Sequence, residues 1–355
     1  MIGERIYQAR KAAGLSLRDL AEQVGVTAMA ISKYERNEST PSSKVLLGLS
    51  KSLGVRVEYF FRQVSVALEN VAHHQHEKLP AKEQAKVFAD VKEQLERWIE
   101  LEEFIPNPWS IPFELPKELP KTIKSYDEIE SVADLMREQW KLGLNPIADL
   151  VDTLEAKGIN VFITQYDGHK HFNGLSAIVN GNPVIVVGKH WPGDRQRFTL
   201  AHELGHLVLN DRLHKNLDEE LACHRFAGAF LVPQAKVITN LGNKRSWLEP
   251  QELMILKHEY GLSMAGWLYR ARDLGILPQQ HFGKLWSYFN KHGWKEIEPN
   301  PQYPKEQTHM FEQLVYHALA EDLIGEAKAA ELLGMSVTAL HAYRNMECPE
   351  RVINQ

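Results

Sequence analysis

Cysteine is scarce in this chain of 355 residues, which contains only Cys223 and Cys348. Two cysteines do not build the disulfide framework that stabilises many small secreted domains. The chain also lacks a signal-peptide pattern and any apolar run long enough to cross a membrane. These absences exclude the disulfide-rich and membrane-spanning classes, and they predict a cytoplasmic protein without a membrane partner.

A strong overall charge is also missing, because the net charge is only −5 at pH 7. Charged residues make up 25% of the chain and hydrophobic residues 44%, as in ordinary soluble proteins of two or three domains. This small total hides an asymmetry. The first 63 residues contain ten Lys or Arg and six Asp or Glu, a net charge of +4, which leaves −9 for the remainder. We therefore expect the first segment to meet a polyanion.

Residues 1–63 carry the start and stop signals of short helices. Ser16 and Thr27 are N-cap candidates, and Gly25 closes the helix that Ser16 begins. Two short helices joined by a tight turn over a small core make a helix-turn-helix, whose second helix enters the major groove of DNA. The apolar positions expected to form this core are Leu17, Leu20, Ala21, Val24, Val26 and Ile31.

The first turn of that second helix supplies the residues that would face base edges. Lys33 can contact guanine or phosphate, and Ala28 and Met29 suit thymine methyl groups. The expected DNA contacts are Ser16, Arg18, Thr27, Ala28, Met29, Ser32, Lys33 and Arg36, with Arg10 and Lys44 as further phosphate contacts. The run SLRDLAEQVGVTAMAISKYERN resembles the Cro/C1-type helix-turn-helix domain of phage repressors, which implies double-stranded DNA as a partner. The alternative is a small helical protein-interaction module.

Residues 64–124 are predicted to form a helical and proline-rich linker. Val87, Val91, Leu95 and Trp98 make one apolar stripe of a helix, which either packs against a neighbouring element or pairs two protomers in a homodimer. Neighbour packing is the favoured interpretation. Five prolines between positions 105 and 121 then indicate an extended, semi-rigid spacer and the clearest domain boundary in the chain.

The run RQRFTLAHELGHLVL contains His202, Glu203 and His206 in the spacing H-E-x-x-H. Residues four apart share one face of a helix, so two imidazoles can reach one metal ion. Glu203 then lies beside the ion without binding it, where a carboxylate can take a proton from water activated by zinc. This pattern is typical of a zinc peptidase. The alternative is a buried helix that happens to be rich in histidine.

A catalytic zinc site needs a third protein ligand, which the acidic start of the next helix can supply. Asp218, Glu219 and Glu220 are all candidates by spacing. Glu219 shares a helix face with Cys223, whereas Glu220 shares one with His224. The spacing leaves the choice among the three acids open.

The H-E-x-x-H run followed by EELACHRFAGAFLVP resembles the ImmA/IrrE family of metallopeptidases. The resemblance implies that Glu219 is the third zinc ligand, beside His202 and His206. It also implies a protein substrate of the repressor or antitoxin type, cleaved in stress or mobile-element biology. The chain departs from the family at Cys223 and His224, where Asn or Asp is more common. Manganese and other divalent ions accept such ligands as well as zinc.

The residues before the H-E-x-x-H run predict a small sheet. Helices are expected near residues 131–142 and 146–156, followed by strands in INVFITQY, LSAIV and NPVIVVG. Turn residues at positions 180–182 predict a hairpin between the last two strands. A sheet edge there would give a peptide substrate a place to add as an extended strand.

Residues 251–355 are predicted to be helical, and part of them repeats the sequence pattern of the first segment. Residues 330–345 align without gaps with residues 21–36, so that Gly334 matches Gly25 and Tyr343 matches Tyr34. Few cations accompany this second helix-turn-helix pattern. We therefore expect a module for packing or partner docking rather than a second DNA reader.

Peptide hydrolysis by zinc also requires a donor that stabilises the developing oxyanion. Spacing does not choose among the candidates for this role, which are Tyr166, His169, His171, His190 and His224.

The expected fold is mostly α with a small β-sheet. It divides into a helix-turn-helix domain (1–63), the linker (64–124), an α+β zinc metallopeptidase domain (125–250) and a helical C-terminal region (251–355). Two functions follow from these parts. The first is a DNA-binding regulator fused to a zinc endopeptidase that cleaves a protein partner. The second is a transcriptional regulator or antitoxin whose peptidase-like domain binds a partner without cutting it.

Overall fold

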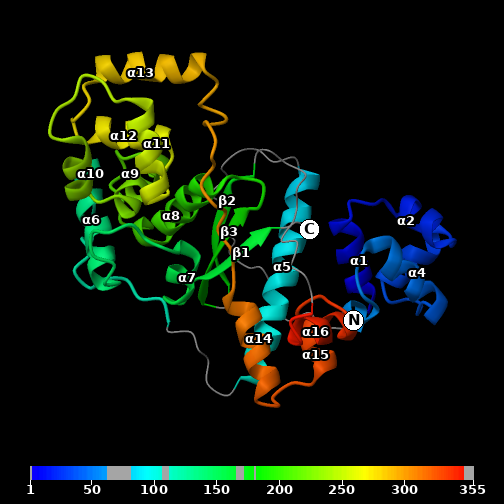
Figure 1. Cartoon of the computed structure of the whole chain (residues 1–355). Coiled ribbons are helices and arrows are strands. Elements are labelled where there is room, and N and C mark those ends of the chain that lie inside the picture. Colours follow the sequence, from blue (N-terminus) through cyan, green and yellow to red (C-terminus); the bar gives the residue numbers. More distant parts are fainter. Residues whose placement is uncertain (1, 62–80, 106–111, 165–171, 180, 348–355) are drawn as a thin grey trace.

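A computed structural model describes residues 2–61, 81–105, 112–164, 172–179 and 181–347 of the chain. Helices dominate, and a single three-stranded sheet lies between the two helical ends of the molecule (Figure 1). The predicted fold class, mostly α with a small sheet, is confirmed. Among the described residues, no helix combines the length and apolar character needed to cross a bilayer.

The N-terminal domain is a compact group of short helices whose ends follow their capping residues. The Ser16 hydroxyl accepts the backbone N–H of Asp19, and Thr27 likewise accepts that of Ala30. Gly25 adopts φ 75°, which lets the chain turn sharply between the two helices. The elements are α1 (Ile2–Ala12), α2 (Leu17–Val24), α3 (Ala28–Glu35), α4 (Ser43–Leu53) and the short 3-10 helix η1 (Val57–Phe61).

A long helix, α5 (Ala81–Phe104), lies between the N-terminal domain and the sheet (Figure 1). Its predicted apolar stripe is buried against residues of the sheet and of the C-terminal helices, and Trp98 contacts the rings of Phe162 and Phe311. The stripe is therefore covered within the chain, as the neighbour-packing interpretation expected. On its other side, α5 contacts α1, and Glu96 of α5 forms a buried ion pair with Arg5 of α1.

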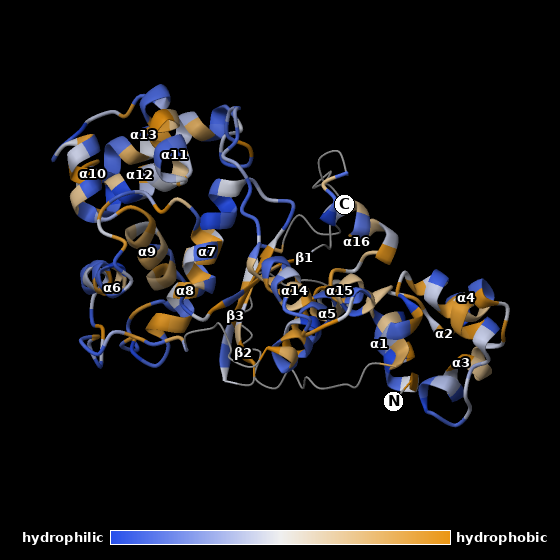
Figure 2. Cartoon of the chain, turned by 60° about the horizontal axis from the view of Figure 1, so that its bottom comes forward, coloured by the Kyte–Doolittle hydropathy of each residue, from blue (hydrophilic) through white to orange (hydrophobic). Residues whose placement is uncertain are grey.

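The sheet consists of β1 (Asn160–Thr164), β2 (Gly174–Val179) and β3 (Asn182–Gly188), in the order β1-β3-β2. β2 and β3 form the expected antiparallel hairpin, whereas β1 runs parallel to β3. Figure 2 shows the apolar residues concentrated on the sheet and on the helices that cover it. β3 is central and buried, and β2 is an edge strand beside the helix of the H-E-x-x-H run.

The helices between residues 126 and 291 share one continuous core that extends from Leu119 to Phe289. The predicted domain boundary after residue 250 thus falls inside this core, since the helices on both sides of it pack together. The elements of this part are α6 (Tyr126–Gln139), α7 (Leu150–Glu155), α8 (Gly193–Leu209), α9 (Glu219–Leu231), α10 (Gln234–Leu241), α11 (Pro250–Tyr260), α12 (Met264–Asp273) and α13 (Gln279–Lys291).

Residues 326–344 form a second helix-turn-helix geometry. Gly334 has φ 68°, and the Ser336 hydroxyl caps the following helix by accepting the backbone N–H of Ala339. This unit packs on α5, where Lys328 forms an ion pair with Glu100. Its helices are α14 (Met310–Ala320), α15 (Glu326–Leu332) and α16 (Val337–Arg344).

Candidate metal centre and nucleic-acid interface

The two histidines of the H-E-x-x-H run lie one helical turn apart on α8 and point to the same spot. Their Nε2 atoms are 3.2 Å apart, and both side chains are buried. Gly205 lies between them and allows α9 to pass closely, because a Cβ at that position would come within 3.3 Å of Cys223 and Phe226. The helix thus brings two ring nitrogens and the start of α9 to one place.

Glu220 supplies the carboxylate that meets these nitrogens. One of its oxygens lies 3.3 Å from His202 Nε2 and the other 3.8 Å from His206 Nε2. Ligand atoms of the three residues all lie within 4.8 Å of one another, the one such group in the part of the chain that the structure describes. Two imidazoles and a carboxylate are a donor set that suits a catalytic zinc ion.

The prediction that Glu219 is the third ligand does not fit this geometry. Its Oε1 lies 3.0 Å from Nδ1 of His206, the ring nitrogen on the far side from the donor set. An Nδ1–H that donates to this carboxylate would leave Nε2 with a lone pair for a metal ion. Glu219 is therefore suited to orient His206 rather than to bind metal.

Cys223 lies on the same side of His206 as Glu219. Its Sγ is 3.4 Å from His206 Nδ1, and burial, with nearby carboxylates, raises the pKa of the thiol. The sulfur thus lies beside Nδ1 and is not among the ligand atoms of the donor set. This position suits Cys223 to packing against His206.

Glu203 is the buried carboxyl beside the donor set. It is 2% exposed, and Ser176 of β2 donates its hydroxyl hydrogen to Oε2 at 2.8 Å. Burial raises the pKa of Glu203 to about 8, and the nearby Glu220 adds to the rise, whereas the Ser176 hydrogen bond opposes it. Sequence reasoning missed Ser176, because nothing in the spacing of the chain links residue 176 to residue 203.

The free edge of β2 runs past this carboxyl. Gly188 donates its backbone N–H to the Asn173 oxygen at 3.0 Å, which fixes the alternation of hydrogen bonds between β2 and β3. By that alternation, the backbone groups of Gly174 and Ser176 point away from β3. Gly174 also lets the strand lie close to α8, because a Cβ there would meet Thr199 at 2.6 Å. The edge of β2 therefore lies on the Glu203 side of the donor set.

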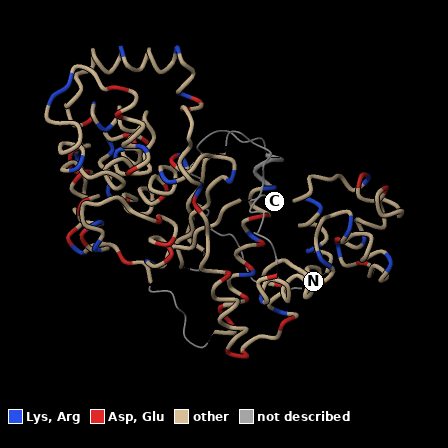
Figure 3. The backbone as a smooth tube through the Cα atoms, in the orientation of Figure 1, with Lys and Arg blue, Asp and Glu red and all other residues tan. Residues whose placement is uncertain are grey.

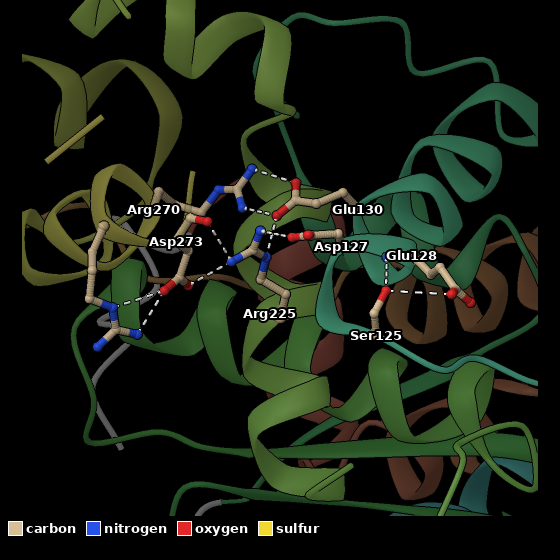
Figure 4. Close-up of polar contacts among 8 residues, drawn as sticks. Ser125, Asp127, Glu128, Glu130, Arg225, Arg270 and Asp273 are labelled. Carbon is tan, nitrogen blue, oxygen red and sulfur yellow. Dashed lines mark hydrogen bonds and ion pairs between the residues drawn. The ribbon is translucent and has the colours of Figure 1, made fainter. Parts of the chain in front are cut away.

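A buried charge network holds α9 in place, and Figure 4 shows its side chains converging from three helices. Glu130 of α6 accepts hydrogen bonds from Arg270 of α12 at 2.5 and 2.9 Å. Arg225, which is next to His224 on α9, pairs with Glu130 and with Asp273. These contacts fix the rotation of α9, and hence the direction in which its acidic first turn points.

A second network fixes the start of α8. Arg197 is buried and donates to Glu306 at 2.7 Å, while Lys257 lies 3.2 Å from Asp194. Gly193 accommodates the backbone of residue 304, which lies too close for any side chain there. Of the two arginines at the start of this helix, Arg197 is therefore structural. Arg195 is half-buried, with its guanidinium over the ring of Trp191.

Most of the predicted DNA contacts lie on the surface of the N-terminal domain. Arg18, Met29, Lys33 and Arg36 are exposed, with Met29 at 63%. Arg36 pairs with Glu38 at the surface. Ser16 and Thr27 are exposed caps, Lys44 is exposed, and Ala28 and Ser32 are partly buried.

Arg10 is an exception among the predicted phosphate contacts. Its guanidinium is buried and donates to both oxygens of Glu35, at 2.5 and 2.9 Å. The phosphate role assigned to it from sequence does not fit this position. Arg10 instead ties α1 to the end of α3.

The five candidates for the oxyanion donor are only partly described. Tyr166, His169 and His171 lie outside the described residues. His190 packs its ring on Trp191, at a centroid distance of 4.3 Å. His224 is exposed, and its ring centroid lies 4.6 Å from that of His202.

Comparison with known sequence families gives two matches. The helix-turn-helix family matches residues 6–60, and the family described as the IrrE N-terminal-like domain (Peptidase_M78) matches residues 154–272. The second match contains the whole sheet, α8, α9 and the donor set. It also extends past residue 250 into α12, in agreement with the continuous core.

Individual relatives are similar over short stretches. Repressor protein C2 of Salmonella phage P22 is 38% identical over 74 residues, which is 21% of this chain and 34% of that protein. The transcriptional regulator SinR of Bacillus subtilis is 47% identical over 58 residues, 16% of this chain and 52% of SinR. The chain thus matches about a third to a half of the length of these relatives.

A solved structure of Bacillus thuringiensis PlcR with the peptide PapR7 and DNA aligns over 100% of this chain and 99% of that one, with 12% identity. Its TM-score of 0.18 is too low to support an argument about the fold. The family matches therefore carry the assignment. The chain combines an N-terminal helix-turn-helix domain of the Cro/C1 type with an IrrE N-terminal-like domain of the M78 peptidase family.

Proposed function

We propose that the chain is a DNA-binding regulator whose M78 domain is a zinc-dependent endopeptidase that cleaves a protein partner. One observation carries the proposal: two imidazole nitrogens and the Glu220 carboxylate converge beside the buried Glu203. A domain that only binds a partner has no need of a buried acid at that position. By the family resemblance, the partner is a repressor or antitoxin-like protein.

In this proposal His202, His206 and Glu220 hold the metal ion, and Glu219 orients His206 through Nδ1. Zinc, when bound, supplies the Lewis acidity that activates water and polarises a peptide carbonyl. Glu203 accepts the proton of the attacking water and passes it to the leaving amine. Ser176 holds the Glu203 carboxyl in the orientation that these two transfers need.

The substrate chain is proposed to lie along the free edge of β2. The outward backbone groups of Gly174 and Ser176 can hydrogen-bond an added strand, and the Ser176 side chain faces α8. A peptide bound in this way passes beside Glu203. Its scissile amide then reaches the water that Glu203 is placed to deprotonate.

Binding to double-stranded DNA is proposed for the N-terminal domain. Arg18 of α2 and Lys33 of α3 are exposed cations, and the capping residues Ser16 and Thr27 begin these two helices. The relatives similar to this domain are named as a repressor and a transcriptional regulator. Figure 3 shows basic positions along this domain. We further propose that the peptidase unit continues to residue 289, since its core does.

The proposal is tested with the full chain carrying Glu203→Gln. The amide keeps the size of the carboxyl but cannot accept a proton, so the variant should bind zinc as the wild type does and lose partner cleavage. Elemental analysis measures the zinc, and mass spectrometry of the partner recovered with the variant identifies the substrate. Glu259→Gln, on the exposed side of α11, is the control for charge removal. Cleavage at the wild-type rate by Glu203→Gln would refute the endopeptidase proposal.

A further inference from the structure

We infer that Phe198 and His224 form a wall that selects an apolar substrate side chain next to the scissile bond. The inference rests on the proposed peptidase function and names a preference of that same site. Neither residue belongs to the donor set, and neither role follows from the H-E-x-x-H spacing. The assignment comes from how α8 and α9 pack.

Three rings from these two helices lie in a row. The ring of Phe198 is stacked on that of His224, with centroids 5.7 Å apart and an angle of 19° between the planes. On its other side, the His224 ring lies 4.6 Å from the ring of His202. Phe198 is one helical turn before His202 on α8, so the row leads directly away from the metal ligands.

This row is accessible to a ligand at His224 and in part at Phe198, whereas His202 is buried. His224 is exposed, and Leu221, three residues before it on α9, is 56% exposed. Residues three apart on a helix are surface neighbours, so the His224 ring and the Leu221 side chain present one aromatic and aliphatic surface beside Glu220. A partly exposed leucine is common on proteins, but this one neighbours His224, whose ring lies beside that of His202.

The row lies on the α9 side of the donor set, and the edge of β2 lies on the other side of it. Glu203, which contacts Ser176 of β2, is on the side of α8 that faces the sheet. Gly205, which contacts α9, is on the opposite side. A peptide bound along β2 with its amide beside Glu203 therefore directs a flanking side chain either toward the row or away from it, since side chains of a strand alternate.

The surface that receives this side chain is aromatic and aliphatic. Burial against Phe198 and Leu221 favours Leu, Met or Phe in the substrate over Asp, Ser or Gly, because the rings and the methyl groups offer dispersion contacts and few hydrogen bonds. One missing methylene in an apolar enzyme pocket changes discrimination by about tenfold or more. The effect is large enough to measure in a mixed peptide library.

The experiment uses the zinc-loaded full chain and a degenerate synthetic peptide library. Wild-type protein digests the library, and sequencing of the products gives the residues on both sides of the cut. In parallel, the zinc-loaded Glu203→Gln protein retains library peptides on a column, a readout that requires no activity. We expect Leu, Met and Phe to be enriched about tenfold at one flanking position in both measurements.

His224→Ala and Phe198→Leu should each reduce this enrichment several-fold while zinc content stays at the wild-type level. His292→Ala is the matched control, because His292 is an exposed histidine at the end of α13, with its ring 4.1 Å from that of Tyr288. An unchanged enrichment in both variants would overturn the inference, as would a flat profile at both flanking positions. If the wild type cuts no peptide, the peptidase proposal fails, and the retained peptides still decide the preference of the wall.

Discussion

Replacing Glu155 by glutamine should stabilise the protein, and the gain should increase with pH. Glu155 ends α7 and is 5% exposed. Burial raises the pKa of its carboxyl to about 8, and Asp152 and Asp149 add to the rise, whereas a hydrogen bond with the backbone of Met310 opposes it. The side chain thus joins the peptidase core to the first residue of α14.

The direction follows from which state holds the proton. In the unfolded chain the carboxyl loses its proton near the ordinary value of 4.5, whereas the folded chain retains it to about 8. Folding is therefore most favoured below the unfolded pKa, and stability is lost as the pH rises until the folded pKa is passed. At about 1.4 kcal/mol per pKa unit, the loss reaches roughly 3 kcal/mol at neutral pH and about 4 to 5 kcal/mol above it, as an upper limit.

Glutamine keeps the size and the hydrogen-bonding oxygen but has no charge to bury. The variant should therefore be close to the wild type at about pH 5 and clearly more stable at about pH 9. Denaturant unfolding of the full chain gives the stability, and hydrogen exchange in α7 and α14 locates the effect. Glu118→Gln, at an exposed position, is the control. A difference between wild type and Glu155→Gln that does not change with pH would refute the reasoning.

Three further predictions concern the metal site, the scaffold and DNA. Glu219→Gln should lower the zinc affinity, measured by chelator competition, by about 10- to 100-fold, and Glu220→Gln should lower it further. The reverse order would restore Glu219 as the ligand. Glu130→Ala should lower the free energy of unfolding by about 3 to 5 kcal/mol, because it removes the carboxylate that pairs with the buried Arg270 and one of the carboxylates that pair with Arg225; a loss below about 1 kcal/mol in denaturant unfolding would contradict this. Lys33→Ala with Arg36→Ala should weaken duplex binding and flatten its salt dependence in titrations; unchanged binding would favour the interaction-module interpretation.

The parts of the fold that sequence predicted well depend on local signals. Ser16, Gly25 and Thr27 determine where two helices start and stop through contacts with their own neighbours, so their roles could be read without a tertiary structure. The same holds for the hairpin of β2 and β3, whose turn residues and alternating pattern lie in one short stretch. The parallel pairing of β1 with β3 has no such local signal and was not predicted.

The candidate site was predicted only as far as one helix determines it. The spacing of His202 and His206 places both on one face of α8 whatever surrounds it. The choice between Glu219 and Glu220 depends instead on the rotation of α9, which Arg225 and its distant acidic partners fix. Since those partners come from other helices, no spacing within α9 could reveal which acid meets the Nε2 atoms.

The two helix-turn-helix units differ in what they can bind, although they share a geometry and a supporting helix. In the alignment, Ala327, Ala342 and Asn345 of the second unit occupy the places of Arg18, Lys33 and Arg36 in the first, so each expected cationic contact has been replaced by a neutral residue. Of the remaining cations, Lys328 and Arg344 are engaged with Glu100 and Glu326, respectively. A phosphate backbone would therefore find little to neutralise it on the second unit.

The second unit instead completes the burial of α5. Lys328 pairs with Glu100, and the first unit pairs Arg5 with Glu96 one helical turn earlier on the same helix. The apolar stripe of α5 meanwhile packs on the sheet that carries Ser176. Displacing the N-terminal domain would break the buried ion pair between Arg5 and Glu96 and expose both charges to water. The proposed DNA reader is thereby held at a fixed orientation to the peptidase sheet through one helix.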